Sequence, residues 1–204
     1  MRCDITPGGA FPDCALVDHA GRGRTLSELQ GRDPLIVVLS RGHRCPEEYQ
    51  HHLELAAFQS KLAAGCARMV TISTDAAPLL QEFRAAVDAR WTFLSDPGRT
   101  VQLDLDIQDY TDPDNDPMVP YTFVLKPGLV IHAIYNGYWL WGRPTADDLW
   151  LDLRAVTQEI RPDWDLGAPG LRASWTAGDR FPFDRWAARR AASESRSPEA
   201  GGES

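Results

Sequence analysis

One cysteine lies where the sequence could support chemistry. Cys45 follows the apolar run at 34–40 and directly precedes Pro46, which suits the first position of a helix. In an open α/β sheet, ligands and reacting groups collect between the carboxyl end of a buried strand and the next helix. Unpaired helix N–H groups and the helix dipole favour thiolate over thiol there. The position indicates a nucleophile for a peroxide oxygen, a disulfide or an acyl carbon, with a small buried hydrophobe as the alternative.

Charged residues flank Cys45 on both sides. Arg41 and Arg44 bring positive charge that stabilises a thiolate, so they are the candidate electrostatic partners. Glu47 and Glu48, in the first helical turn, oppose that effect. Glu48 either accepts a proton beside Cys45 or is a solvated acid, and its place in a first turn favours the second alternative.

The other cysteines and a nearby histidine give weaker signals. His43 could be a base or a metal ligand, but the cysteines lack the paired spacing of a zinc site, so no metal and no cofactor is predicted. Cys66 is expected to be a small buried hydrophobe. Cys3 and Cys14 could resolve an oxidised Cys45 only if the front segment of the chain folds over it.

In the acidic segment 112–116, every second residue is an aspartate, as in a calcium-binding loop. It lacks the glycine and the glutamate that such a loop needs, because Pro117 and Phe123 occupy those positions. The segment is therefore predicted to be a polar loop.

The elements that must hold Cys45 in place follow from hydrophobic periodicity. Buried strands are predicted at 34–40 and 67–74, and helices at 46–65, 75–90 and 145–160. The residues expected on the apolar face of the helix after Cys45 are Tyr49, Leu53, Ala56, Ala57 and Leu62. The next helix is expected to open at Asp75, and the last at Thr145.

Shorter elements complete the pattern. A strand, turns and a short helix capped by Thr25 precede the first buried strand. A short strand, a turn and a short helix are predicted at 92–107, and two strands joined by a Lys-Pro-Gly turn at 120–137. Two parallel crossovers followed by a hairpin and a helix predict a three-layer α/β/α sandwich with a mixed sheet and an N-terminal extension.

Composition limits the classes of function. The chain has 204 residues, enough for one domain with tails, and a formal net charge of −8 with a pI near 5.1. Such a charge disfavours nucleic acid and anionic lipid as partners. No apolar stretch approaches the roughly 20 residues that cross a bilayer, and no signal core is visible near the start, so the chain is predicted to be cytoplasmic.

The C-terminal part is predicted to differ from the domain at 1–160. Residues 161–188 are expected to form an arm that packs on the domain or on a partner, and 189–204 a disordered tail. Aromatic residues are dense in and before this arm: Tyr135, Tyr138, Trp139, Trp141, Trp164, Trp175 and Trp186. This density indicates an interface, possible in a homodimer, or alternatively the wall of a substrate pocket.

From about residue 5 to 160 the sequence resembles the peroxiredoxin-like branch of the thioredoxin-fold superfamily, the alkyl hydroperoxide reductase and thiol-specific antioxidant group. The resemblance rests on the stretch from "PGGAFPDC" to "SRGHRCPEE", and on "VTISTD", "FLSDPGRT" and "VPYTFVLKPGLVI". It implies that Cys45 attacks a hydroperoxide, forms a sulfenic acid and is reduced by an external thiol. It thus implies a thiol-dependent peroxidase of one-cysteine type.

The sequence also departs from that resemblance. Ordinary peroxiredoxins have a hydroxyl residue three positions before the cysteine and an arginine on a later strand, where this chain has Gly42 and Pro120. Arg41, Arg44 and Arg143 are the candidates to supply the missing charge. The resemblance to thioredoxins implies a cis bond before Pro120, and a trans proline opening an edge strand is the alternative.

In the related motif Arg-Gly-x-Trp-Cys-Pro-x-Cys, the last position is a cysteine, and here it is Glu48. Disulfide exchange within the motif is therefore excluded. These departures keep two further hypotheses open: a redox-inactive protein that serves as a binding module, and a biosynthetic enzyme that uses Cys45 on an acyl or sulfur compound.

Overall fold

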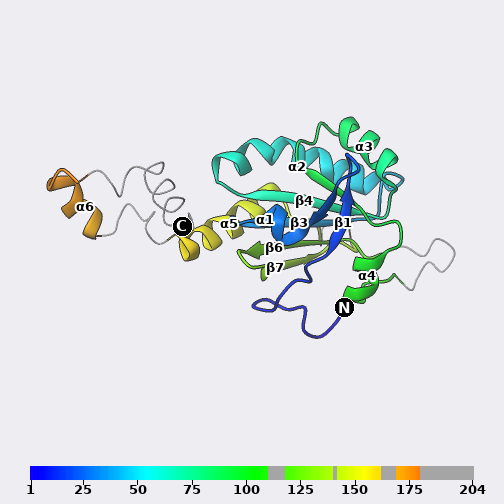
Figure 1. The fold of residues 1–204 in the computed structure, drawn as a ribbon, viewed down its shortest axis with the longest axis horizontal. Coiled ribbons are helices and arrows are strands. Elements are labelled where there is room, and N and C mark those ends of the chain that lie inside the picture. The colour runs from blue at the N-terminus through cyan, green and yellow to red at the C-terminus, as the bar shows by residue number, and fades with distance from the viewer. Residues whose placement is uncertain (110–117, 140–141, 162–168, 180–204) are drawn as a thin grey trace, which may run out of the picture. The chain divides into compact units, whose positions relative to one another are not determined.

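The computed structural model describes residues 1–109, 118–139, 142–161 and 169–179. Its centre is a seven-stranded mixed sheet with the strand order β2-β1-β5-β4-β3-β6-β7 (Figure 1). The strands are β1 (Ala15–Asp18), β2 (Gly23–Thr25), β3 (Leu35–Ser40), β4 (Arg68–Ser73), β5 (Thr92–Ser95), β6 (Tyr121–Lys126) and β7 (Val130–Asn136). The helices are α1 (Leu26–Gln30), α2 (Pro46–Ala64), α3 (Ala77–Ala86), α4 (Thr100–Leu105), α5 (Ala146–Ile160) and α6 (Pro169–Thr176).

Strand β3 lies in the interior of the sheet, and its apolar run explains this position. All its residues are buried, and it pairs in parallel with β4 and antiparallel with β6. A strand buried on both faces needs an unbroken apolar sequence, which this run supplies. The predicted mixed sheet is confirmed, since β4 also pairs in parallel with β5 and β7 pairs antiparallel with β6.

Helices cover both faces of the sheet. On one face, the rings of Phe83 in α3 and Phe93 in β5 lie 6.2 Å apart, and those of Phe58 in α2 and Trp150 in α5 lie 6.4 Å apart. On the other, α1 and α4 contribute to the main hydrophobic core, which includes Leu26, Leu29, Val37, Leu39, Val101 and Leu105. Figure 1 shows α2 and α3 along one side of the sheet and α4 along the other. The predicted α/β/α arrangement is therefore confirmed.

Local capping signals set two helix starts. The hydroxyl of Thr25 accepts from the N–H of Glu28, whose carboxylate accepts from the N–H of Thr25, so the predicted cap of α1 is a full capping box. Thr145 caps α5 in the same way through Asp148. The expected cap at Asp75 is wrong: α3 begins at Ala77, because the Asp75 carboxylate accepts hydrogen bonds from another loop.

The buried face of α2 differs from the prediction. Tyr49 and Leu53 are exposed. The residues that α2 buries are Glu48, His51, His52, Leu55, Phe58 and Leu62. A pattern that counts only apolar residues misses this face, because half of its members are ionisable side chains.

The chain divides into two compact units, residues 1–157 and 158–204. The first holds the sheet and its core. In the second, the described residues include the end of α5 and α6, on which Trp175 is exposed. Residues 112–116, Trp141, Trp164, Trp186 and the predicted tail at 189–204 lie outside the described residues, so the predicted arm stays a prediction. No helix in the described ranges is long and apolar enough to cross a bilayer.

Candidate active site

Cys45 lies at the predicted corner between β3 and α2. It is the N-cap residue of α2, and Pro46 holds the first helical position. The carbonyl of Cys45 accepts hydrogen bonds from the N–H groups of Glu48 and Tyr49, while its side chain makes no capping hydrogen bond. Cys45 is half-buried and forms no disulfide. Cys45 therefore lies, partly exposed, at the positive end of a 19-residue helix.

Asp75 determines the shape of the loop that leads to Cys45. The N–H of Cys45 donates to the carbonyl of Gly42 across 3.3 Å, which makes 42–45 a tight turn. Gly42 has a φ of +97°, and a β-carbon on it would lie 2.7–2.9 Å from the Asp75 carboxylate. The space that a side chain would need three positions before Cys45 is thus filled by Asp75, so a hydroxyl residue does not fit there.

Asp75 also holds His43. The Nδ1 atom of His43 lies 2.8 Å from one carboxylate oxygen of Asp75, and the backbone N–H of His43 donates to the other across 2.8 Å. The hydroxyl of Ser73 donates to Asp75 as well, and the hydroxyl of Ser95 donates to the Asp75 carbonyl. These contacts fix Asp75, and through it the imidazole.

Arg41 is not the open cation that the sequence suggested. Its Nε–H donates to the carbonyl of Met118 across 2.9 Å, and its guanidinium lies 3.2 Å from the carboxylate of Asp109. Arg41 therefore connects the loop before Cys45 to a distant segment. Arg44, by contrast, is exposed and forms no ion pair or hydrogen bond within the described part of the chain.

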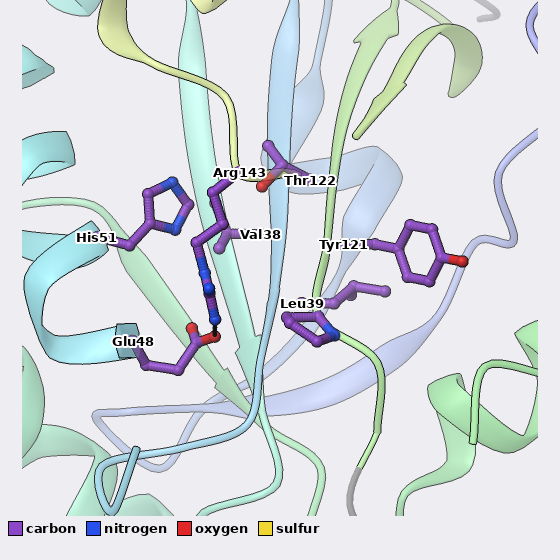
Figure 2. A pocket seen from close by; sticks show the side chains of 8 residues that line it. Val38, Leu39, Glu48, His51, Tyr121, Thr122 and Arg143 are labelled. Carbon is purple, nitrogen blue, oxygen red and sulfur yellow. Dashed lines mark hydrogen bonds and ion pairs between the residues drawn. The ribbon is translucent and has the colours of Figure 1, made fainter. Parts of the chain in front are cut away.

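The expectation that Glu48 is a solvated acid is wrong. Its carboxylate is fully buried and lies 2.6 Å from the guanidinium of Arg143, whose side chain is 7% exposed. Glu47, nearly half exposed, lies 3.5 Å from the same guanidinium. Figure 2 shows Arg143 extending between α2 and the strands to reach Glu48, with His51 on the same helix. A charge can stay buried at this depth only with such a partner.

Two buried histidines adjoin the Glu48–Arg143 pair. Burial lowers the pKa of His51 to about 3, with the charge of neighbouring groups as a smaller cause, and its Nε2 has no hydrogen-bond partner. Burial also lowers the pKa of His52. His52 donates from Nδ1 to the carbonyl of Glu48 and, through Nε2, contacts the hydroxyl of Thr71. Both side chains are therefore neutral in the folded protein.

Pro120 lies against the Glu48–Arg143 pair, and the bond before it differs from the prediction. It lines the small space around Glu48 and Arg143, and its carbonyl accepts from the N–H of Gly137. The implied cis bond before Pro120 is wrong, because the described residues contain no cis peptide bond. Pro120 instead precedes β6 as a trans residue at the start of the strand.

The other cysteines are poorly placed to react with Cys45. Cys66 follows α2 at its opposite end, about 30 Å away at 1.5 Å per helical residue. Cys14 packs against the core, and burial raises the pKa of its thiol to about 11. Cys3 is exposed. Within the described residues, no cluster of three or more histidine, cysteine or acidic side chains could hold a metal ion.

Comparison with known proteins assigns the family. The sequence model of the AhpC/TSA family matches residues 7–134, more than half of the chain. This protein belongs to the AhpC/TSA family. No curated protein matches the sequence significantly.

Solved structures of peroxiredoxins confirm the thioredoxin-like fold of this AhpC/TSA member. Peroxidoxin BcpB from Mycobacterium tuberculosis is 20% identical, with a TM-score of 0.65 over 77% of this chain and 99% of that one. A cysteine-to-serine mutant of PrxQ from Xylella fastidiosa is 16% identical, with a TM-score of 0.66 over 76% and 98% of the two chains. A putative thiol:disulfide interchange protein DsbE from Chlorobium tepidum is 21% identical, with a TM-score of 0.59 over 74% and 98%.

The structure brings most of the predicted site residues to one region, and adds others. Gly42, His43 and Cys45 share one turn, and Arg143 reaches the helix that Cys45 opens. Asp75 was not predicted to take part. Its place two residues after the end of the buried strand β4, parallel to β3, could have indicated it, since the carboxyl ends of parallel strands meet at one sheet edge.

Proposed function

We propose that this AhpC/TSA protein is a thiol-dependent peroxidase that uses Cys45 as its single nucleophilic cysteine. The observation that carries the proposal is the half-buried sulfur at the N-terminus of α2, outside any disulfide. The N-terminus of α2 and the exposed Arg44 bring positive charge near the sulfur. Arg143 offsets the opposing charge of Glu48.

The proposed reaction has two halves. The Cys45 thiolate attacks the terminal oxygen of a hydroperoxide, so that an S–O bond forms, the O–O bond breaks and an alcohol or water leaves after protonation. An external thiol then attacks the sulfenic sulfur, releases water and leaves a mixed disulfide, which a second thiol reduces. The placement of Cys14 and Cys66 supports an external rather than an internal reductant.

The expected result of the direct test is specific to one cysteine. One equivalent of hydroperoxide added to the reduced protein should give a sulfenic acid on Cys45, detected by mass spectrometry after trapping with a dione. Cys45→Ser should give none, while Cys66→Ser, the control at the opposite end of α2, should react as the wild type does. Wild-type protein that forms no sulfenic acid at Cys45 contradicts the proposal.

A second candidate function is a binding module without redox turnover. The exposed side chains of Tyr138 and Trp139, with ring centres 5.2 Å apart, favour it. It becomes the better reading if Cys45 does not react in the test above. A cytoplasmic location and a homodimer remain parts of the proposal.

A further inference from the structure

The pair formed by His43 and Asp75 has a chemistry that the family assignment does not explain. Because a carboxylate only accepts, the Nδ1 of His43 must carry a proton to bind Asp75 at 2.8 Å. The Nε2 atom is then the one that gains or loses a proton. His43 is partly exposed, and its Nε2 has no hydrogen-bond partner in the described part of the chain. This is the arrangement of a base oriented by a third group.

The turn places His43 two residues before the nucleophile. The hydrogen bond from the Cys45 N–H to the Gly42 carbonyl closes the turn 42–45, of which His43 is the second residue. A side chain on Gly42 would collide with the Asp75 carboxylate that binds His43. Thus Asp75 both excludes the usual hydroxyl residue and holds a proton carrier in the same loop.

The charges around His43 suit this role. Asp75, from the turn between β4 and α3, lies 2.8 Å from Nδ1 and orients the ring. Arg41 in the same loop is paired with Asp109, and Glu48 in the next helix with Arg143. Arg44, adjacent in the turn, is exposed.

We propose that His43 is the proton donor to the leaving oxygen when Cys45 attacks a hydroperoxide, and that Asp75 is its positioning residue. The proposal rests on the peroxidase function. The Cys45 thiolate forms the S–O bond with the terminal oxygen and the O–O bond breaks. Nε2 of His43, protonated from solvent, gives its proton to the departing alkoxide or hydroxide. The products are a sulfenic acid and an alcohol or water.

The test compares leaving groups. An alkoxide from cumene hydroperoxide needs a proton to leave, whereas the carboxylate from peracetic acid does not. His43→Gln should slow the oxidation of Cys45 by cumene hydroperoxide about 100-fold or more, and by peracetic acid no more than about threefold. Asp75→Asn should show the same contrast with a smaller loss. Stopped-flow measurement of the oxidation rate between pH 5 and 9 should also show that His43→Gln loses one limb of the pH profile.

The controls separate this role from a structural one. His132 forms another histidine–aspartate pair, with Asp152, between β7 and α5, and His132→Gln should oxidise as the wild type does. Alkylation of Cys45 by iodoacetamide reports the folded turn without an oxygen leaving group. If His43→Gln slows both oxidants equally, or neither, the proposal is overturned while the peroxidase function stands. If the wild type forms no sulfenic acid, the peroxidase function itself fails.

Discussion

At the scale of single residues, the position of Glu48 shows how burial reverses the expected behaviour of a side chain. An acid in the first turn of a helix is usually solvated and interacts with the helix N–H groups. Glu48 instead points into the protein, where Arg143 lies 2.6 Å away. One oxygen of Glu48 and the Nε of Arg143 still lack hydrogen bonds. The pair is therefore costly to desolvate and costly to break.

We expect Glu48→Gln to lower the free energy of unfolding by about 3 kcal/mol, because it leaves the buried guanidinium of Arg143 without its charge partner. Glu47→Gln is the matched control: Glu47 lies 3.5 Å from the same guanidinium but is nearly half exposed, so its loss should cost less than about 1 kcal/mol. Urea denaturation of the two variants checks this. If both variants lose the same free energy of unfolding, burial does not account for the contribution of the Glu48–Arg143 pair to stability.

At the scale of elements, the junction between β3 and α2 depends on a contact from the junction after β4. Gly42 has both a left-handed φ and no room for a β-carbon, because the Asp75 carboxylate is too close. The Asp75 carboxylate therefore supports the turn, the imidazole of His43 and, through the turn, Cys45. A change at Gly42 should act on all three.

Gly42→Ala should lower the free energy of unfolding by more than backbone strain alone would. It should also slow the oxidation of Cys45. Gly128→Ala is the control, because Gly128 has a φ of +81° with nothing within 4 Å of the added carbon. It should lose about 1 kcal/mol from strain. Thermal unfolding and peroxide oxidation of both variants measure the difference. If Gly42→Ala resembles Gly128→Ala in both assays, Asp75 does not control the turn.

At the scale of the whole molecule, the buried histidines of α2, His51 and His52, make the free energy of unfolding depend on pH. An unfolded histidine takes up a proton near pH 6.5, but burial lowers the pKa of His51 to about 3 in the folded state. Between these values the unfolded chain binds more protons, so the free energy of unfolding falls as the pH falls. His52, whose pKa burial also lowers, acts in the same direction.

We expect the wild type to lose up to about 1.4 kcal/mol per pH unit for each such histidine below pH 6.5. His51→Leu should make this dependence less steep than that of the wild type. Chemical denaturation at a series of pH values from 7 to 4 provides the measurement. An unchanged slope in His51→Leu would show that His51 does not titrate as its burial implies.

The sequence alone determined the layers, the mixed sheet and the corner that carries Cys45. These features depend on local signals: the unbroken apolar run of β3, the Pro46 start of α2 and the caps at Thr25 and Thr145. Such signals act between residues close in the chain, so they can be read in order along it.

Only the tertiary structure decided which charged side chains go inside and what they meet. Glu48 and Arg143 are 95 positions apart, and His43 and Asp75 are 32 apart. A polar residue is predicted to be exposed unless a partner compensates for its desolvation, and that partner comes from a segment that folding brings near. For this reason the buried face of α2, the trans bond at Pro120 and the support of the Cys45 turn became visible only in the folded chain.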